Sequence, residues 1–447
     1  MSEQSKLQQA IEHVLSAVQS KGAQADVIAS SSNSFSLKAN KGELDEYKVT
    51  SGQVIGVRVV QDQRVATSYS ESLEPESLDQ MLNNALDSAR FAKVDEHQQI
   101  SCLNSNIKSD LEEINQPDTV SVDDKIALAL SLEQGVTSKP YEPSSPYNGY
   151  GESESQLLIA NTQGTFCEHK ERSFSCYAYT LLEKDGKQSM DGASSCGRSF
   201  SELDSKFCID HGYDLAFDLL EGEPVATGNY SVIFEVDALS SLFGAFGLCF
   251  SGVSAMKGVN PWREKLGQSV ASPLFSMTDK AYVEGGMNIC AFDSEGFAAK
   301  DNQLIEKGEL KTLLHNSHTA KALDAESTAS ASRGAKSSLD VSPRHKVIAV
   351  GSSSSAEVTG GEYLELVDLA GVHSGADAIS GDFSFGASGF LCRDGKRVQP
   401  VRGITVAGNF YKMLNEIDAM GSVLETSQSR NFYSPVIRFA RLSIGGK

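Results

Sequence analysis

Residues 237–257 read Asp-Ala-Leu-Ser-Ser-Leu-Phe-Gly-Ala-Phe-Gly-Leu-Cys-Phe-Ser-Gly-Val-Ser-Ala-Met-Lys, with no charged side chain between the two end residues. Large apolar residues recur at intervals of three and four, which places them on one face of a helix. Gly244, Gly247 and Gly252 keep the other side of that helix thin. The stretch therefore predicts a buried helix against which other elements pack closely, and its glycine and serine content argues against a membrane span.

The composition of the whole chain limits the possible classes of protein. Its 447 residues are enough for two or three domains, and a formal net charge of -20 disfavours direct binding to nucleic-acid phosphates. The eight cysteines are scattered without a Cys-x-x-Cys pair, which is typical of reduced thiols. The N-terminus lacks the pattern of a signal peptide. We therefore expect a cytoplasmic protein that does not enter a membrane.

The first half of the chain predicts one arrangement twice. A helix over 7–19 precedes strands over 26–31, 34–40, 43–50 and 53–60 and a helix that starts at Pro75. A helix over 122–132, capped by Ser121, precedes strands over 156–161, 165–172, 174–183 and 187–198 and a helix over 207–220. The repeated order indicates an internal duplication, although two α+β segments can also share this common pattern by chance.

A glycine- and proline-containing segment at 221–229 marks the predicted domain boundary. We predict an α+β protein with an N-terminal domain, residues 1–222, of duplicated helix, sheet and helix units. Residues 223–447 are predicted to form a mostly-β domain that contains the buried Gly-rich helix. Its expected strands are 230–235, 290–292, 303–306, 309–314, 346–349, 390–393, 396–401, 404–407 and 436–444.

Few residues suggest chemistry on their own. His315 and His318 could share a metal ion, but no cysteine or carboxylate stands near them in the sequence to complete a ligand set. Cys249 could serve as a nucleophile if a histidine approached it, whereas packing as a small apolar residue is the commoner role of a buried cysteine. The chain has no P-loop, no Rossmann fingerprint and no Gly-x-Ser-x-Gly elbow.

The segment 380–390 combines glycines with serine, aspartate and aromatic residues. We predict a loop beside a strand, with main-chain groups free to hold an extended peptide. An equally good interpretation is a set of tight turns that the fold itself requires. The candidate peptide-binding residues are Ser380, Gly381, Asp382, Phe383, Ser384, Gly386, Gly389 and Phe390.

The same segment carries a family resemblance. Residues 378–390 (Ala-Ile-Ser-Gly-Asp-Phe-Ser-Phe-Gly-Ala-Ser-Gly-Phe), 400–409 (Pro-Val-Arg-Gly-Ile-Thr-Val-Ala-Gly-Asn) and Met413 resemble the C-terminal signature of the PmbA/TldD family. Residues 292–296 (Phe-Asp-Ser-Glu-Gly) and 265–268 (Lys-Leu-Gly-Gln) fit the same family in the same order. The resemblance covers nearly the whole chain and implies a cytoplasmic two-domain α+β protein, with a metallopeptidase-like C-terminal domain, that belongs to a peptidase of small peptides.

The resemblance further implies one of two branches. In the TldD branch the central helix carries His-Glu-x-x-x-His, whose histidines hold zinc together with a later cysteine while the glutamate acts as the base. In the PmbA branch, also called TldE, this motif is missing. Here Gly244, Ala245 and Cys249 fall at the first His, Glu and second His positions, and residues 427–431 offer no thiol where the later cysteine would stand. One cysteine cannot hold a catalytic zinc, so we predict no catalytic residue, metal ligand or cofactor in this chain.

The function implied by this comparison is that of a non-catalytic PmbA/TldE-type subunit. It would pair with a zinc-bearing TldD-type subunit, or form a homodimer when alone, in a complex that processes unfolded peptides such as peptide-antibiotic precursors and antitoxins. An alternative is a protein-binding regulator of DNA gyrase, as an older name of the family suggests. A third hypothesis is a cysteine hydrolase that uses Cys249.

Overall fold

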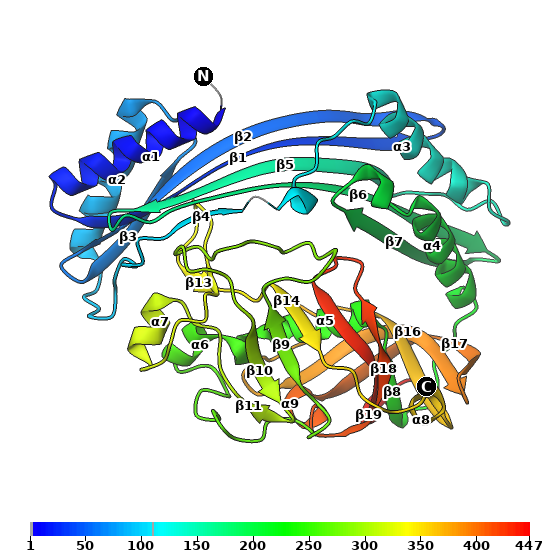
Figure 1. Cartoon of the computed structure of the whole chain (residues 1–447). Coiled ribbons are helices and arrows are strands. Elements are labelled where there is room, and N and C mark those ends of the chain that lie inside the picture. The colour runs from blue at the N-terminus through cyan, green and yellow to red at the C-terminus, as the bar shows by residue number, and fades with distance from the viewer. Residues whose placement is uncertain (1–2, 110) are drawn as a thin grey trace.

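The structure is a computed structural model that describes residues 3–109 and 111–447. Two β-sheets organise the chain. A seven-stranded sheet has the strand order β3-β2-β1-β5-β6-β4, with β7 also paired to β6, and a ten-stranded sheet follows in the C-terminal part. The first sheet arches over the second, with α1 and α2 at one end of the arch and α3 and α4 at the other (Figure 1). The chain thus combines α and β elements as predicted.

The N-terminal part contains two units of helix, three strands and helix. Its elements are α1 (Glu3–Ser20), β1 (Gln24–Asn40), β2 (Glu43–Gln61), β3 (Arg64–Ser70), α2 (Pro75–Phe91), β4 (Asn106–Ser109), η1 (Glu112–Ile114), α3 (Val122–Thr137), β5 (Asn148–Asn161), β6 (Phe166–Lys184), β7 (Lys187–Gly197), η2 (Phe200–Glu202) and α4 (Ser205–Leu219). The first strands of the two units, β1 and β5, pair antiparallel at the centre of the sheet. This symmetric order supports the interpretation of an internal duplication.

The strands of this sheet are longer than predicted. The four strands expected between residues 26 and 60 are two continuous ones, β1 and β2, that pair along their whole length with one register shift at Lys38 and Ala39. Lys41 and Gly42 form the turn between β1 and β2, and both residues have a positive φ. Neither strand contains a proline that would interrupt the ladder, so both continue across the arch.

The C-terminal part contains the remaining elements. These are β8 (Gly228–Phe234), α5 (Val236–Ala245), η3 (Gly247–Phe250), α6 (Gly252–Met256), β9 (Met277–Lys280), β10 (Asn302–Glu306), β11 (Glu309–Leu310), α7 (Ser317–Ala322), β12 (Ala331–Ser332), β13 (Asp340–Val341), β14 (His345–Ile348), α8 (Ser355–Thr359), β15 (Glu362–Ala370), β16 (Asp382–Arg393), β17 (Lys396–Asn409), α9 (Phe410–Met413), β18 (Ile417–Thr426) and β19 (Phe432–Gly445). The strand predicted at 290–292 is wrong, because this segment makes only an isolated bridge between Phe292 and Ala298.

The strands around α5 close into a ring. β8 pairs with β15 on one side and with β19 on the other, and β15, β16, β17 and β19 are paired in sequence. Each strand of the ring therefore has a paired neighbour on both sides over part of its length. α5 packs its apolar face into the core that these strands share, where the Phe246 ring stacks on Phe410 with centroids 4.4 Å apart. The apolar face of residues 237–257 is buried as predicted, whereas Gly244 and Gly247 are exposed.

The prediction of one continuous helix over residues 237–257 is wrong. α5 ends at Ala245, a short 3-10 turn (η3) follows, and Ser251 caps α6 by accepting a hydrogen bond from the Ser254 amide. The backbone leaves the helical path to bond with another segment. The Leu314 amide donates to Phe250 O, and the Gly252 amide donates to Leu314 O, each at 2.8 Å. Glycine and serine resist this departure less than better helix formers do.

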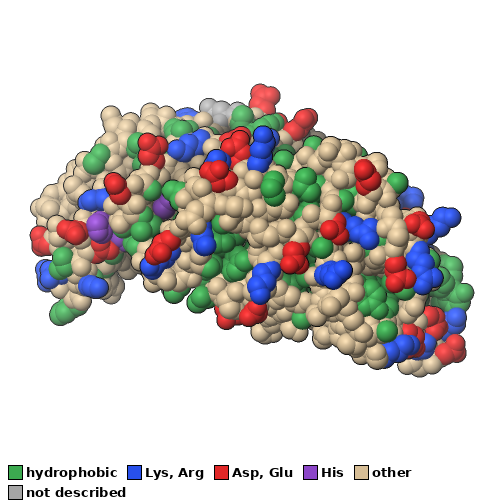
Figure 2. All heavy atoms as spheres, turned by 90° about the horizontal axis from the view of Figure 1, so that it is seen from below, with side chains coloured by type: hydrophobic (Ala, Val, Ile, Leu, Met, Phe, Trp, Pro, Cys, Tyr) green, Lys and Arg blue, Asp and Glu red, His purple; other side chains and the backbone are tan. Residues whose placement is uncertain are grey.

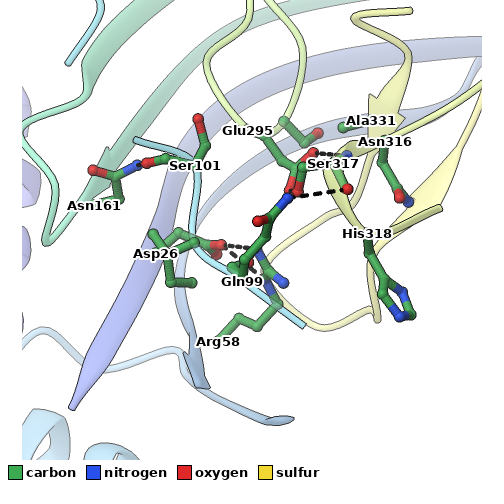
Figure 3. Close-up of polar contacts among 12 residues, drawn as sticks. Asp26, Arg58, Gln99, Ser101, Asn161, Glu295, Asn316, Ser317, His318 and Ala331 are labelled. Carbon is green, nitrogen blue, oxygen red and sulfur yellow. Dashed lines mark hydrogen bonds and ion pairs between the residues drawn. The ribbon is translucent and has the colours of Figure 1, made fainter. Parts of the chain in front are cut away.

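Four buried charges connect the two parts of the chain, and we call them the interdomain ion cluster: Asp26, Arg58, Glu295 and Arg333. Arg58 Nη2 lies 2.5 Å from Asp26 Oδ2 and 3.5 Å from Glu295 Oε1, and Arg333 Nη2 lies 2.5 Å from Asp26 Oδ1. The Ser317 amide donates to Glu295 Oε2 at 2.7 Å (Figure 3). Asp26 and Arg58 belong to β1 and β2, whereas the other residues come from C-terminal loops and α7, so the cluster holds the two parts in register.

No helix among the described residues combines the length and the apolar character that crossing a bilayer requires.

The glycines of the central stretch give a first test of this packing. A Cβ added to Gly252 would lie 2.4 Å from His315 Nδ1 and 2.6 Å from Leu314 O, whereas a Cβ on Gly244 would meet no atom within 4 Å. We expect Gly252→Ala to lower the free energy of unfolding by about 1–3 kcal/mol, because the backbone must move. Gly244→Ala should leave it unchanged or raise it by up to about 1 kcal/mol, since alanine favours a helix. Denaturant unfolding of both variants measures this, and equal effects would contradict it.

The interdomain ion cluster gives a second test. Arg58→Met removes one cation and leaves Asp26 and Glu295 buried with insufficient positive charge, so the free energy of unfolding should fall by about 3–5 kcal/mol. The matched control is Lys336→Ala, since Lys336 also bridges the two parts, through Glu71, but lies exposed. The control should unfold like the parent protein in the same denaturant series. A mild effect of Arg58→Met, equal to that of the control, would show that the cluster does not hold the two parts together.

Candidate functional site

The family resemblance places the positions of a zinc motif at the end of α5 and just after it, at Gly244, Ala245 and Cys249. Gly244 is exposed and Ala245 is half-buried. A Cβ on Gly244 or Gly247 would meet no atom within 4 Å. The close packing predicted around the glycines is therefore wrong for Gly244 and Gly247 and correct for Gly252. The face of the helix that carries the motif positions is open.

Cys249 points in the opposite direction, into the core. Its side chain is fully buried, and its carbonyl accepts a hydrogen bond from Asn260 Nδ2 at 3.0 Å. Burial raises the pKa of the Cys249 thiol well above its usual value, so the thiol is neutral. Lys346 lies close enough to interact electrostatically with Cys249, and burial lowers the pKa of its ammonium group. A neutral, inaccessible thiol is a poor nucleophile, which argues against the cysteine hydrolase hypothesis.

The side chains at the motif positions do not fit zinc. Gly244 and Ala245 offer no donor atom, and the Cys249 thiol would have to lose its proton in the core beside an amine. Across residues 3–109 and 111–447, no group of three or more His, Cys, Asp or Glu side chains is arranged to hold a metal ion.

The turn between β18 and β19, residues 427–431, lies where the family comparison would need a third ligand. The Gln428 amide donates a hydrogen bond to Asp237 Oδ1 at the start of α5, at 3.0 Å. The amide of Lys346 donates to Asn431 O at 3.0 Å. The turn thus reaches from the beginning of α5 to the neighbourhood of Cys249, but Ser427 and its neighbours bring no thiol to it.

His315 and His318 turn toward different partners. His315 Nδ1 lies 3.2 Å from Thr319 Oγ1, and the residue is buried beneath Gly252. His318 Nε2 lies 2.8 Å from Asp95 Oδ2 in the N-terminal part. Both histidines therefore have structural contacts, and the weak metal pair suggested by their spacing does not form.

The loop predicted over residues 380–390 is wrong, because Asp382–Arg393 is strand β16. This strand pairs with β17 along its whole length and with β15 from Gly386 onward. The Ser384 amide donates to Gly375 O at 2.8 Å, and a Cβ on Gly389 would lie 1.9 Å from Glu365 O. The glycines thus serve the packing of the sheet. Peptide binding by these residues stays a prediction, but their main-chain groups are already bonded and do not support it.

A cavity that the sequence did not reveal lies between the two parts of the chain, beside the start of α5. Its volume is about 500 Å³, and it is lined by α4, α5, β7, β15, β17 and the 427–431 turn. Four carboxyl groups lie along its wall: Asp191, Glu235, Asp237 and Asp368. They come from segments as far apart as residues 191 and 368, so no local motif could have predicted this acidic cavity.

The four carboxyl groups of the acidic cavity have raised pKa values. Burial, together with repulsion from Asp237, raises the pKa of Glu235 to about 7. Burial raises the pKa of Asp191 to about 6. Burial also raises the pKa of Asp237 and of Asp368. Carboxyl groups that titrate near neutral pH can donate and accept protons, and such groups are concentrated at functional sites.

These shifts predict a pH dependence of stability. The ordinary pKa values are 3.8 for Asp191 and 4.5 for Glu235, and both are higher in the folded protein. Between about pH 4 and 7 the folded chain retains protons that the unfolded chain has lost, so these groups make stability fall as the pH rises. One pKa unit is worth about 1.4 kcal/mol, so the double variant Asp191→Asn, Glu235→Gln should show a measurably flatter decline.

Urea unfolding at a series of pH values measures the decline. The control is Asp185→Asn, in the exposed turn between β6 and β7, which should leave the slope unchanged. An unchanged slope in the double variant would show that the two carboxyl groups are solvated like ordinary ones.

Three models of one family match the chain: PmbA/TldA metallopeptidase domain 1 at residues 25–89, the central domain at 115–219 and the C-terminal domain at 227–446. The metalloprotease PmbA of Escherichia coli O157:H7 is 26% identical over 434 residues, which cover 94% of this chain and 92% of that protein. A metalloprotease TldD homologue of Buchnera aphidicola is 22% identical and covers 88% of this chain and 86% of its own length.

Solved structures share the fold. TldE from Thermococcus kodakarensis superposes with a TM-score of 0.84 at 20% identity, covering 98% of this chain and 100% of that chain. A protein from Thermotoga maritima described as a candidate modulator of a DNA gyrase has a TM-score of 0.84 at 21% identity, with the same coverage. The three family models cover most of the arch, the C-terminal part and the positions of Gly244, Ala245 and Cys249. The chain therefore belongs to the PmbA/TldD family.

Proposed function

We propose that this chain is a non-catalytic subunit of the PmbA/TldE kind in a peptide-processing zinc metallopeptidase. The observation that carries the proposal is the composition of the motif positions. Gly244 and Ala245 open the helix face but supply no ligand or base, and Cys249 is buried as a neutral thiol. A chain with the fold of a metallopeptidase family and without its metal chemistry needs that chemistry from another subunit.

The partner in this proposal is a TldD-type subunit that holds zinc. Relatives named for both PmbA and TldD align with most of this chain, so the two kinds of subunit share its length. In the absence of the partner, this chain would form a homodimer through the surface that otherwise contacts the TldD-type subunit. The complex would work on unfolded peptides, such as peptide-antibiotic precursors and antitoxins, in the cytoplasm. This chain would supply one wall of the peptide cavity.

The test measures zinc and peptide cleavage together. We expect the chain purified alone to contain far less than one zinc per molecule and to leave an unfolded test peptide intact. Mixing it with a TldD-type protein from the same cell should produce cleavage that neither subunit shows alone, because only the complex joins zinc to this chain. Metal analysis by mass spectrometry and peptide cleavage followed by chromatography check these outcomes.

The motif positions provide the controls. Cys249→Ala in this chain should leave cleavage by the complex unchanged, whereas loss of the first zinc-motif histidine of the partner should abolish it. Zinc-dependent cleavage by the lone chain would overturn the proposal.

Regulation of DNA gyrase is a second candidate function, because one structural neighbour is described as a candidate gyrase modulator. The net charge of -20 disfavours direct DNA contact, and Lys, Arg, Asp and Glu side chains are interspersed on the face shown in Figure 2. The partner in this case would be the gyrase protein itself. A pull-down from the native cell that returned gyrase without a TldD-type subunit would favour this function over the peptidase.

A further inference from the structure

The acidic cavity is bordered by one edge of strand β7. Among the described strands, β7 pairs only with β6, and its other edge faces the C-terminal part (Figure 1). Arg402 Nη1 donates to Gln188 O at this edge, at 2.8 Å. The Ser194 amide donates to Gln428 Oε1, at 2.6 Å. Main-chain groups alternate in direction along an antiparallel strand, so those of the even-numbered residues of β7 point toward the C-terminal part.

Free main-chain groups lie in the middle of this edge. Met190 and Gly192 both line the cavity. The Gly192 amide bonds to Asp191 Oδ1, at 2.8 Å. The N–H and C=O groups of Met190 and the C=O group of Gly192 have no hydrogen-bond partner among residues 3–109 and 111–447. Free groups in such a row can pair with an extended peptide as a further strand.

A buried hydroxyl group in the same wall also lacks a partner. Ser189 lines the cavity and is only 4% exposed. Its hydroxyl makes no hydrogen bond to any residue that the structure describes, although hydroxyl groups buried to this extent normally have a partner. Ser189 and Asp191 are two positions apart on β7, so their side chains lie on the same face of the strand. The group that Ser189 lacks would therefore lie beside Asp191.

The charge of the cavity favours a cation as its ligand. Four carboxyl groups line it, against one guanidinium group, Arg402, and one imidazole, His211. Arg402 already bonds to the carbonyl of Gln188. A positive group among the carboxyl groups would stabilise their ionised forms, which burial alone disfavours.

The exposed side of the cavity offers apolar contacts. Tyr179 and Met190 line it, with 38% and 49% of their surface exposed. Long basic side chains pack their aliphatic stems on such surfaces while the charged end reaches a polar partner. The cavity volume of about 500 Å³ is in the range that holds a ligand of the size of a short peptide segment.

We propose that the free edge of β7 and the acidic cavity together bind an extended peptide that carries a basic side chain. The peptide main chain pairs with Met190, the stem of the basic residue lies on Tyr179, and its charged end lies between Asp191 and Glu235. This inference rests on the proposed function, which supplies an unfolded peptide, and adds a preference for a basic residue beside the main-chain contacts.

The first experiment measures binding to the full chain, purified without a TldD-type partner, by isothermal titration calorimetry at pH 8. The probe is a five-residue peptide, acetyl-Thr-Val-Lys-Val-Thr-amide, and the comparison peptide has norleucine in place of lysine. The lysine peptide should bind about tenfold or more tightly, because only its ammonium group bonds to the carboxylates. Equal affinities would overturn the proposal, and so would 1,4-diaminobutane that bound as tightly as the lysine peptide.

The pH dependence of binding identifies the carboxyl groups. The affinity for the lysine peptide should rise between pH 5.5 and 8, since Asp191, with a pKa of about 6, and Glu235, with a pKa of about 7, lose their protons in this range. Burial lowers the pKa of His211, and its loss of positive charge with rising pH acts in the same direction. The charged groups that face these residues are Asp237, Glu365, Asp368, Arg397 and Arg402.

A double variant tests this assignment. Asp191→Asn, Glu235→Gln should bind the lysine peptide no more tightly than the norleucine peptide and should remove most of the rise with pH. Asp185→Asn, in the exposed turn before β7, is the matched control and should bind like the parent chain. A folded double variant that kept both the preference and the rise would refute the charge contacts.

The main-chain contacts have their own test. Met190→Pro removes an N–H group that points away from β6, so the sheet should tolerate it while binding of both peptides falls about tenfold. Gln188→Pro makes the same change on the same edge outside the cavity and should bind normally. A lysine peptide methylated at the lysine amide nitrogen should also bind more weakly, and it decides the outcome if a thermal melt shows that Met190→Pro is unfolded. Unchanged binding of the methylated peptide would refute pairing with β7.

These outcomes are distinct from those of the zinc and cleavage test. Binding to the lone chain needs neither zinc nor a partner, so its absence would overturn this inference and leave the subunit role standing. A lone chain that binds the lysine peptide, in a mixture with a TldD-type protein that cleaves nothing, would support this inference and contradict the proposed peptidase role.

Discussion

The C-terminal part of this protein depends on the burial of one face of α5. Phe243 and Phe246 pack against Phe410 and Phe432, and the strands around them close into a ring because β8, which leads directly into α5, pairs on both sides. The apolar face anchors the helix so firmly that the opposite face carries no packing role at Gly244 and Gly247. The position of the helix therefore does not depend on contacts at Gly244 and Gly247.

The altered motif and the acidic cavity lie at different points along the same helix. Gly244 and Ala245 stand near its end, and Asp237 stands in its first turn beside the cavity. The 427–431 turn contacts Asp237 through Gln428 and the backbone of Lys346 through Asn431. The region around α5 therefore retains carboxyl groups with raised pKa values, although it lacks a set of metal ligands.

The interface between the arch and the C-terminal part is rich in buried charge. Asp26, Arg58, Glu295 and Arg333 neutralise one another there, and Glu295 belongs to the Phe-Asp-Ser-Glu-Gly segment that carried part of the family resemblance. Paired charges of this kind define one relative position, because any displacement would leave a charge buried and unpaired.

Local patterns determined the elements of this protein and its family. The period-two and period-3.6 patterns located the helices α1 to α5 and most strands, but they missed the short helices α7, α8 and α9. The family resemblance, applied to Gly244, Ala245 and Cys249, predicts that this chain lacks the metal ligands, and that stays a prediction. These properties depend on residues that are neighbours along the chain.

Only the tertiary structure decided which groups are free. It showed that the backbone of residues 382–390 is paired, that Gly244 is open while Gly252 is crowded, and that the helix breaks to bond with Leu314. It also brought Asp191 and Glu235 to the wall of one cavity. Each of these outcomes joins residues separated by tens of positions. Their exposure, their partners and their pKa values depend on burial, which a sequence pattern does not specify.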